Sequence, residues 1–159
     1  MQSRTNSIAM NIQTKRTNFT DKDFINLVKE LDAFLTIRNG ESDEFFSQFN
    51  SIENLAHVIV IYSEKIPIGC GAIKKYNSET VEIKRMYVQE KHQGKNLGVV
   101  ILNALEIWAK ELGNTRCILE TGTMLPEAIR FYEKNNYQRI PNYDQYIGVA
   151  ESVCFKKRL

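Results

Sequence analysis

One stretch of the sequence decides how the rest is interpreted: residues 81–98, which read VEIKRMYVQEKHQGKNLG from Val81 to Gly98. Its first part belongs to a β-strand expected over Thr80 to Val88. A polar loop follows, and a glycine-bearing turn, residues 93–98, then leads into a long helix expected over 96–112. The apolar side chains of that last segment repeat at the spacing of one helix face. The stretch therefore predicts a strand, a loop and a helix in immediate succession.

The turn before this helix is a candidate anion site. The first backbone N–H groups of a helix have no partner within the helix, and the helix dipole places partial positive charge beside them. Gly94 and Gly98 permit close approach of a phosphate, Asn96 tolerates the left-handed conformation, and Lys95 adds a positive charge. A pyrophosphate cradle is one interpretation, and a simple turn before a helix is the other. The P-loop and dinucleotide-binding patterns are both absent.

The remaining elements surround this stretch in an order typical of one α/β (α+β) domain. A strand is expected at 11–18, and a helix follows with Thr20 as its candidate N-cap. A short helix is expected at 42–49, a three-strand meander at 57–62, 66–76 and 80–88, a strand at 116–120, a helix from 126, and strands at 137–140 and 152–156. The domain is expected to span residues 10–159, with residues 1–9 as a flexible leader. Either Met1 or Met10 could be the native start.

Composition narrows the function classes. The chain has 159 residues, and its net charge is only +2, which disfavours nucleic acid as a partner. It contains no run of about 18 apolar residues, so no membrane span is expected, and its polar start does not resemble a signal peptide. Three widely spaced cysteines predict a cytoplasmic protein without disulfides. No metal is expected, because no His, Cys or carboxylate cluster has ligand spacing.

Two segments resemble motifs of one family. Gln93 to Gly98 is similar to motif A of the GNAT acetyltransferase superfamily, Gln/Arg-x-x-Gly-x-Gly/Ala, with Asn96 in place of the middle glycine. Residues 126–137 resemble motif B of the same superfamily, where Ala128, Phe131 and Tyr132 match. An asparagine common three residues before the alanine is replaced by Leu125. The resemblance covers roughly residues 60–140.

The resemblance implies a mixed, twisted, mostly antiparallel sheet, flanked by helices, whose fourth and fifth strands splay apart. Acetyl-CoA, as co-substrate, would lie in that gap. Its pantetheine would contact the main chain of Met86 and Val88. Its pyrophosphate would contact the backbone amides of Gln93, Gly94, Lys95, Asn96, Leu97, Gly98 and Val99.

Acetyl transfer to an amine also requires proton transfer. The alkylammonium, with a pKa near ~10, must lose a proton, and the departing thiolate must gain one. The resemblance implies that Glu82, on the strand bordering the gap, is the base, acting directly or through water, although an ion pair with Lys84 is an alternative role. Tyr132 matches the tyrosine that many members of the family place near the CoA sulfur, so the resemblance makes it the candidate acid, with core packing as the alternative. The Val88 N–H would polarise the carbonyl. Glu120, Thr121, Tyr143 and Tyr146 are weaker candidates for facing the acceptor.

The sequence therefore predicts an N-acetyltransferase that acts on a primary amine of a small molecule within a ternary complex. Two alternatives stay open: transfer to a protein or peptide, and a non-catalytic domain that senses CoA. No nucleic-acid or membrane partner is expected. The sequence does not identify the acceptor, the acyl-chain preference or the oligomeric state, and homodimerisation stays open.

Overall fold

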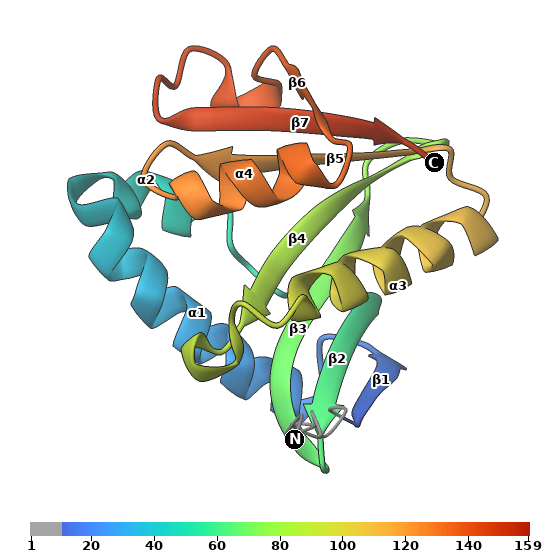
Figure 1. Cartoon of the computed structure of the whole chain (residues 1–159). Coiled ribbons are helices and arrows are strands. Elements are labelled where there is room, and N and C mark those ends of the chain that lie inside the picture. The colour runs from blue at the N-terminus through green and yellow to red at the C-terminus, as the bar shows by residue number, and fades with distance from the viewer. Residues whose placement is uncertain (1–10) are drawn as a thin grey trace, which may run out of the picture.

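The computed structural model describes residues 11–159, so the predicted leader and the choice between Met1 and Met10 lie outside the described residues. Seven strands form one sheet in the order β1-β2-β3-β4-β5-β7-β6 (Figure 1). The strands are β1 (Ile12–Thr17), β2 (His57–Ser63), β3 (Ile66–Lys75), β4 (Thr80–Val88), β5 (Arg116–Gly122), β6 (Gln138–Ile140) and β7 (Ser152–Arg158). The α-helices are α1 (Lys22–Asn39), α2 (Asp43–Ser47), α3 (Leu97–Glu111) and α4 (Pro126–Lys134). The predicted element order and fold class are confirmed.

The start of α1 differs from the prediction by one residue. Asp21, not Thr20, caps the helix, because its Oδ1 accepts hydrogen bonds from the amides of Asp23 and Phe24 at 2.9 and 3.1 Å. The Thr20 hydroxyl instead donates to the Asn18 side chain at 2.6 Å. Both residue types are good N-caps, and the carboxylate is the one next to the first helical residue.

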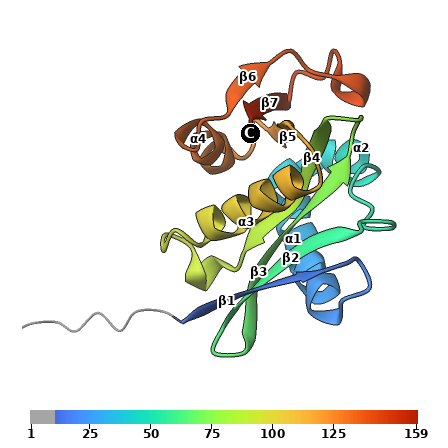
Figure 2. The same cartoon turned by 90° about the vertical axis from the view of Figure 1, so that its right-hand side faces the viewer.

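Helices cover both faces of the sheet (Figure 2). On one face, α3 and α4 pack over Ile83 and Leu119 in a large apolar cluster. On the other face, α1 packs through Phe24 and Leu27 over a second cluster that includes Val60. Because successive side chains of a strand point to opposite faces, odd-numbered residues of β4 and β5 face α3 and α4 near their start. Even-numbered residues there face the side of α1.

β4 and β5 separate soon after they begin. They pair in parallel only over Thr80–Glu82 and Arg116–Ile118, whereas β5 pairs with β7 along its whole length. A β-bulge in β4 places Arg85 and Met86 opposite Gly71, and Arg85 has a φ of 56°. Bulges bend the strand that carries them, so β4 curves away from β5 (Figure 1). The expected splay of the fourth and fifth strands is present.

Candidate active site

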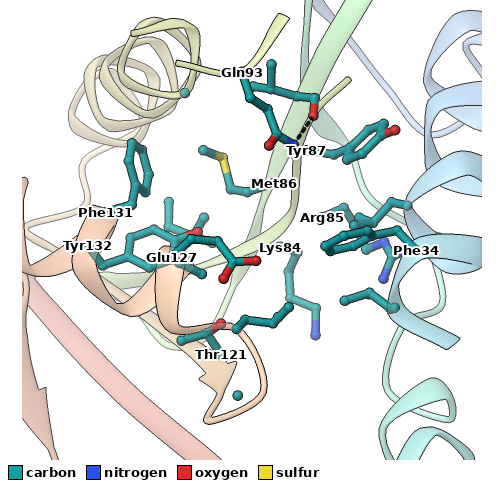
Figure 3. A pocket seen from close by; sticks show the side chains of 18 of the residues that line it. Phe34, Lys84, Arg85, Met86, Tyr87, Gln93, Thr121, Glu127, Phe131 and Tyr132 are labelled. Carbon is teal, nitrogen blue, oxygen red and sulfur yellow. Dashed lines mark hydrogen bonds between the residues drawn. The ribbon is translucent and has the colours of Figure 1, made fainter. Parts of the chain in front are cut away.

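A cavity of about 590 Å³ fills the gap between β4 and β5 (Figure 3). Its wall is formed by the second half of β4, the turn before α3, the end of β5, one side of α4 and the end of α1. Side chains from both faces of the sheet reach it, including Tyr132 on one face and Glu120 on the other. The volume is in the range of small-ligand sites. The cavity therefore passes through the sheet where the strand ladder is missing.

The turn before α3 leaves its amides open toward this cavity. Asn96 is the N-cap residue in the left-handed conformation, with a φ of 60°, and its side chain makes no capping hydrogen bond. Gly94 also has a positive φ, of 78°. Gly98 lies so close to Phe131 that a Cβ would be 3.1 Å from the ring. The contact at Gly98 packs α3 closely against α4, whereas a Cβ on Gly94 would meet nothing within 4 Å. The turn thus offers N–H donors and open space at Gly94 for an anion at the positive end of a 15-residue helix.

Two residues of the turn differ from the others. The Gln93 amide donates to the Glu90 carbonyl at 3.1 Å, and its side chain donates to the Val88 carbonyl at 2.9 Å. Lys95 is exposed and does not line the cavity. His92, just before the turn, is half-buried and lines the wall. The amides available for an anion therefore begin at Gly94.

The end of β4 presents backbone groups to the gap. The Gln89 amide donates to Ile68 of β3 at 2.9 Å, and because backbone groups alternate along a strand, the Val88 N–H points the other way, into the gap. The Val88 carbonyl accepts from the Gln93 side chain, and the Val88 N–H is a free donor with respect to residues 11–159. The side chain of Met86 also points into the cavity (Figure 3).

Two carboxylates lie on the face of the sheet toward α1. Tyr143 donates to Glu82 Oε2 at 2.6 Å, and the ammonium of Lys84 lies 3.6 Å from Glu82 Oε1. Lys84 also donates to the Phe49 carbonyl at 3.1 Å. The ion pair considered for Glu82 is therefore present, and Glu82 nevertheless lines the cavity.

Glu120 of β5 is the second carboxylate. It accepts one hydrogen bond, from Ser152 Oγ to its Oε2 at 2.9 Å. Burial raises the pKa of Glu120 to about 7, and the nearby Glu82 acts in the same direction, whereas Ser152 and Lys84 oppose the shift. Aromatic rings cover this region: Tyr146 is buried and lies 5.8 Å from Tyr143 and 5.7 Å from Phe49, measured between ring centroids.

Tyr132 lies on the opposite face of the sheet, on the side of α4 that packs against the strands. Its ring is 6% exposed and packs edge-on against Phe131 and Tyr137, at centroid distances of 5.1 and 5.6 Å. Burial raises the pKa of Tyr132, so the hydroxyl stays protonated at neutral pH. Burial alone accounts for this shift, and no hydrogen bond from described residues contributes to it. Tyr132 thus packs in the core and also borders the cavity.

Comparison with known proteins agrees with this geometry. Residues 25–137 match the model of the Acetyltransferase (GNAT) family. The chain belongs to that family. The Escherichia coli (strain K12) protein named uncharacterized N-acetyltransferase YjgM is 33% identical over 131 residues, which cover 80% of this chain and 75% of that protein. The crystal structure of the "putative acyl-CoA N-acyltransferase" from Klebsiella pneumoniae is 30% identical, with a TM-score of 0.78 over 93% of this chain and 97% of that one.

More distant GNAT structures share the fold. PaiA N-acetyltransferase from Thermoplasma acidophilum, solved in complex with coenzyme A, is 17% identical, with a TM-score of 0.73 over 94% of this chain and 100% of that one. GNAT enzymes are acyltransferases that use acetyl-CoA, so the predicted enzyme class is confirmed.

Two interactions near this cavity could not be predicted from the sequence. Arg85 is buried and forms an ion pair with Asp32 of α1, and its Nε has no hydrogen-bond partner in the described part of the chain. At the end of α1, Arg38 contacts Glu127 of α4 at 2.9 Å and the Met124 carbonyl at 3.0 Å. Each joins segments far apart in the chain, and no local pattern indicates such a contact.

Among residues 11–159, no three His, Cys, Asp or Glu side chains lie close enough together to hold a metal ion. No helix in the same range is both long and apolar enough to cross a membrane.

Proposed function

We propose that this protein transfers the acetyl group of acetyl-CoA to a primary amine of a small molecule, by direct attack in a ternary complex. The observation that carries the proposal is the cavity through the sheet. One opening has free backbone amides at the start of a long helix, and the other has two carboxylates, Glu82 and Glu120. An anionic donor and a cationic acceptor would therefore approach the gap from opposite faces.

The donor side fits acetyl-CoA. The pyrophosphate would bind the amides from Gly94 to Val99, where the backbone is open and the helix dipole is favourable. The pantetheine would run along the unpaired edge of β4, beside Met86 and Val88. The thioester carbonyl would then accept from the Val88 N–H, the free donor on this edge, which stabilises the negative charge that develops on oxygen.

The acceptor side fits a small amine better than a peptide. Tyr143 and Tyr146 cover the carboxylates, and Phe49 closes this cover from the side of α2. At the mouth, the Arg38–Glu127 ion pair joins α1 to α4. A peptide in extended conformation would need an open groove at this position. An ammonium group would be attracted to the carboxylates, and an apolar body would pack against the rings.

Tyr132 would give the proton to the departing sulfur. It borders the cavity from the α4 side, opposite the carboxylates, and its neutral hydroxyl is free to donate. A domain that only senses CoA would have no use for a donor on one face and proton acceptors on the other. We therefore favour catalysis over sensing.

The test combines binding with turnover. Acetyl-CoA binding is measured by calorimetry, and thiol release is measured with a panel of amines, amino acids and peptides. We expect binding, and release with amines but not with peptides. Release with peptides alone would overturn the small-molecule assignment, and binding without any release would favour the sensor.

Tyr132→Phe separates the acid role from packing. The variant should lower kcat by about 100-fold, the low end for general acid catalysis, with an unchanged Kd for acetyl-CoA. Tyr137→Phe is the matched control, because Tyr137 packs against Tyr132 in the same cluster but does not line the cavity. An equal loss in both variants would refute the acid role.

A further inference from the structure

Glu82 and Glu120, the two carboxylates on the acceptor face, differ in their hydrogen bonds and ion pairs. Both oxygens of Glu82 are engaged, Oε2 by Tyr143 at 2.6 Å and Oε1 by Lys84 at 3.6 Å. Glu120 receives only the Ser152 hydroxyl, on Oε2, so its Oε1 has no protein partner among the described residues. One carboxylate is thus fixed by its neighbours, and the other has a free oxygen beside the cavity.

The position of Glu120 favours contact with the reacting nitrogen. Glu82 is opposite Ile118 in the last pair of the β4–β5 ladder. Glu120 comes two residues later on the same face, at the point where the strands have separated and the cavity begins. Both side chains line the cavity, but only Glu120 projects from the strand that borders the far side of the gap.

The groups around Glu120 come from three elements. Glu82 and Lys84 face it from β4, Ser152 and Cys154 from β7, and Tyr146 from the covering loop. Burial and the charge of Glu82 favour the neutral carboxyl group, whereas Lys84 and Ser152 favour the carboxylate. The opposing effects leave a carboxyl group that can both accept and release a proton near neutral pH.

We infer that Glu120, rather than Glu82, removes the proton from the acceptor ammonium, while Glu82 binds and orients the acceptor. The inference rests on the proposed function. It assigns proton transfer to Glu120 of β5 and acceptor binding to Glu82 of β4.

The protons of the reaction balance in this scheme. The ammonium gives one proton to Glu120, which later releases it to solvent. The neutral nitrogen attacks the thioester carbon, forming the C–N bond, and the C–S bond then breaks. Tyr132 gives a proton to the departing sulfur, and the second proton lost from nitrogen restores the tyrosine hydroxyl. The products are the N-acetylated amine and CoA thiol.

The kinetic test uses acetyl-CoA and the best acceptor from the amine panel. For the wild type, kcat/KM should fall on the acid side with an apparent pKa near 7. Glu120→Gln should lower kcat by about 100-fold or more, in the range of a lost general base, and should abolish the acid limb. Glu82→Gln should raise KM and shift the limb to lower pH, because it removes a negative charge near Glu120. Lys84→Gln should shift the limb to higher pH.

Two results would overturn the inference. The first is an acid limb that persists in Glu120→Gln and disappears in Glu82→Gln, which would make Glu82 the base. The second does not depend on finding an acceptor: in protein labelled with ¹³C at glutamate carboxyl groups and bound to CoA, the Glu120 resonance, identified by its loss in Glu120→Gln, should titrate near 7. Titration near the ordinary value of about 4.3 would exclude Glu120 as the base. Absence of turnover with every amine would instead count against the proposed function.

Discussion

Replacing Glu120 with glutamine should stabilise the protein, and the gain should grow as the pH rises from 5 to 8. The reason is the buried carboxyl group. Its pKa is raised from 4.5 to about 7 in the folded state. A group with a raised folded-state pKa contributes stability that is complete below the unfolded pKa and is lost as the pH rises through the folded one. The wild type should therefore lose stability at this residue between about pH 4.5 and pH 7.

The size of the effect follows from the shift. Each pKa unit is worth about 1.4 kcal/mol, so the change from 4.5 to about 7 corresponds to about 3 kcal/mol. Glutamine has the shape of the protonated carboxyl group and still accepts the hydrogen bond from Ser152. The variant should resemble the wild type near pH 4 and exceed it by about 3 kcal/mol at pH 8, by the same conversion.

The assay is urea unfolding at pH 5, 6, 7 and 8, with the free energy extrapolated to zero urea. Glu111→Gln is the control, because Glu111 pairs with Arg16 at the surface and its pKa is lowered by that hydrogen bond. The control should show no gain that rises with pH. A difference between Glu120→Gln and wild type that stays constant from pH 5 to 8 would refute the reasoning.

Two further predictions concern stability. Gly71→Ala should cost about 1–3 kcal/mol, because a Cβ there would lie 2.8 Å from Ile101 Cγ2; thermal unfolding should show a lower midpoint, and Gly122→Ala, whose Cβ has 3.6 Å of clearance, should not. Tyr137→Phe should cost about 1.5–3 kcal/mol, because it removes the 2.8 Å hydrogen bond to the buried Glu106. Burial raises the pKa of Tyr137, so the wild type should lose stability above about pH 10, where the unfolded tyrosine ionises. Denaturant unfolding at pH 9 and 11 should show a smaller loss for Tyr137→Phe, and equal losses would contradict this account.

Most of the element order was predictable because it depends on local patterns. The periodicity of 97–112 and the strand at Thr80–Val88 involve neighbours in sequence, and both are confirmed. The N-cap of α1 was missed because Thr20 and Asp21 are both suitable, and the choice depends on where the backbone first turns. Nothing local predicts a left-handed arginine, so the bulge at Arg85 had no signal.

The acceptor side was predictable only in outline. Glu82 was chosen by resemblance, and Glu120 was a weaker candidate from its place at a strand end. The features that distinguish them are contacts across the sheet: Tyr143 is 61 residues from Glu82, and Ser152 is 32 residues from Glu120. The burial of these carboxyl groups and the charges beside them depend on residues that only folding brings together. The sequence alone therefore does not predict which carboxyl group has a free oxygen.

The short ladder between β4 and β5 has a mechanical consequence. The hydrogen-bonded ladder between the two parts of the sheet consists of three residue pairs at one end, and beyond these pairs the parts are joined by the apolar cluster under α3 and α4. Val88 lies six residues beyond this joint, about 20 Å away along the strand, so a rotation of about 5° at the joint moves the far end of β4 by about 2 Å over that length. A ligand that occupies the gap would restrict this rotation, and at 100 times its Kd it would stabilise the folded protein by about 2.7 kcal/mol. The missing hydrogen bonds that would make room for acetyl-CoA should therefore also let this end of β4 bend, and we expect bound acetyl-CoA to reduce that motion.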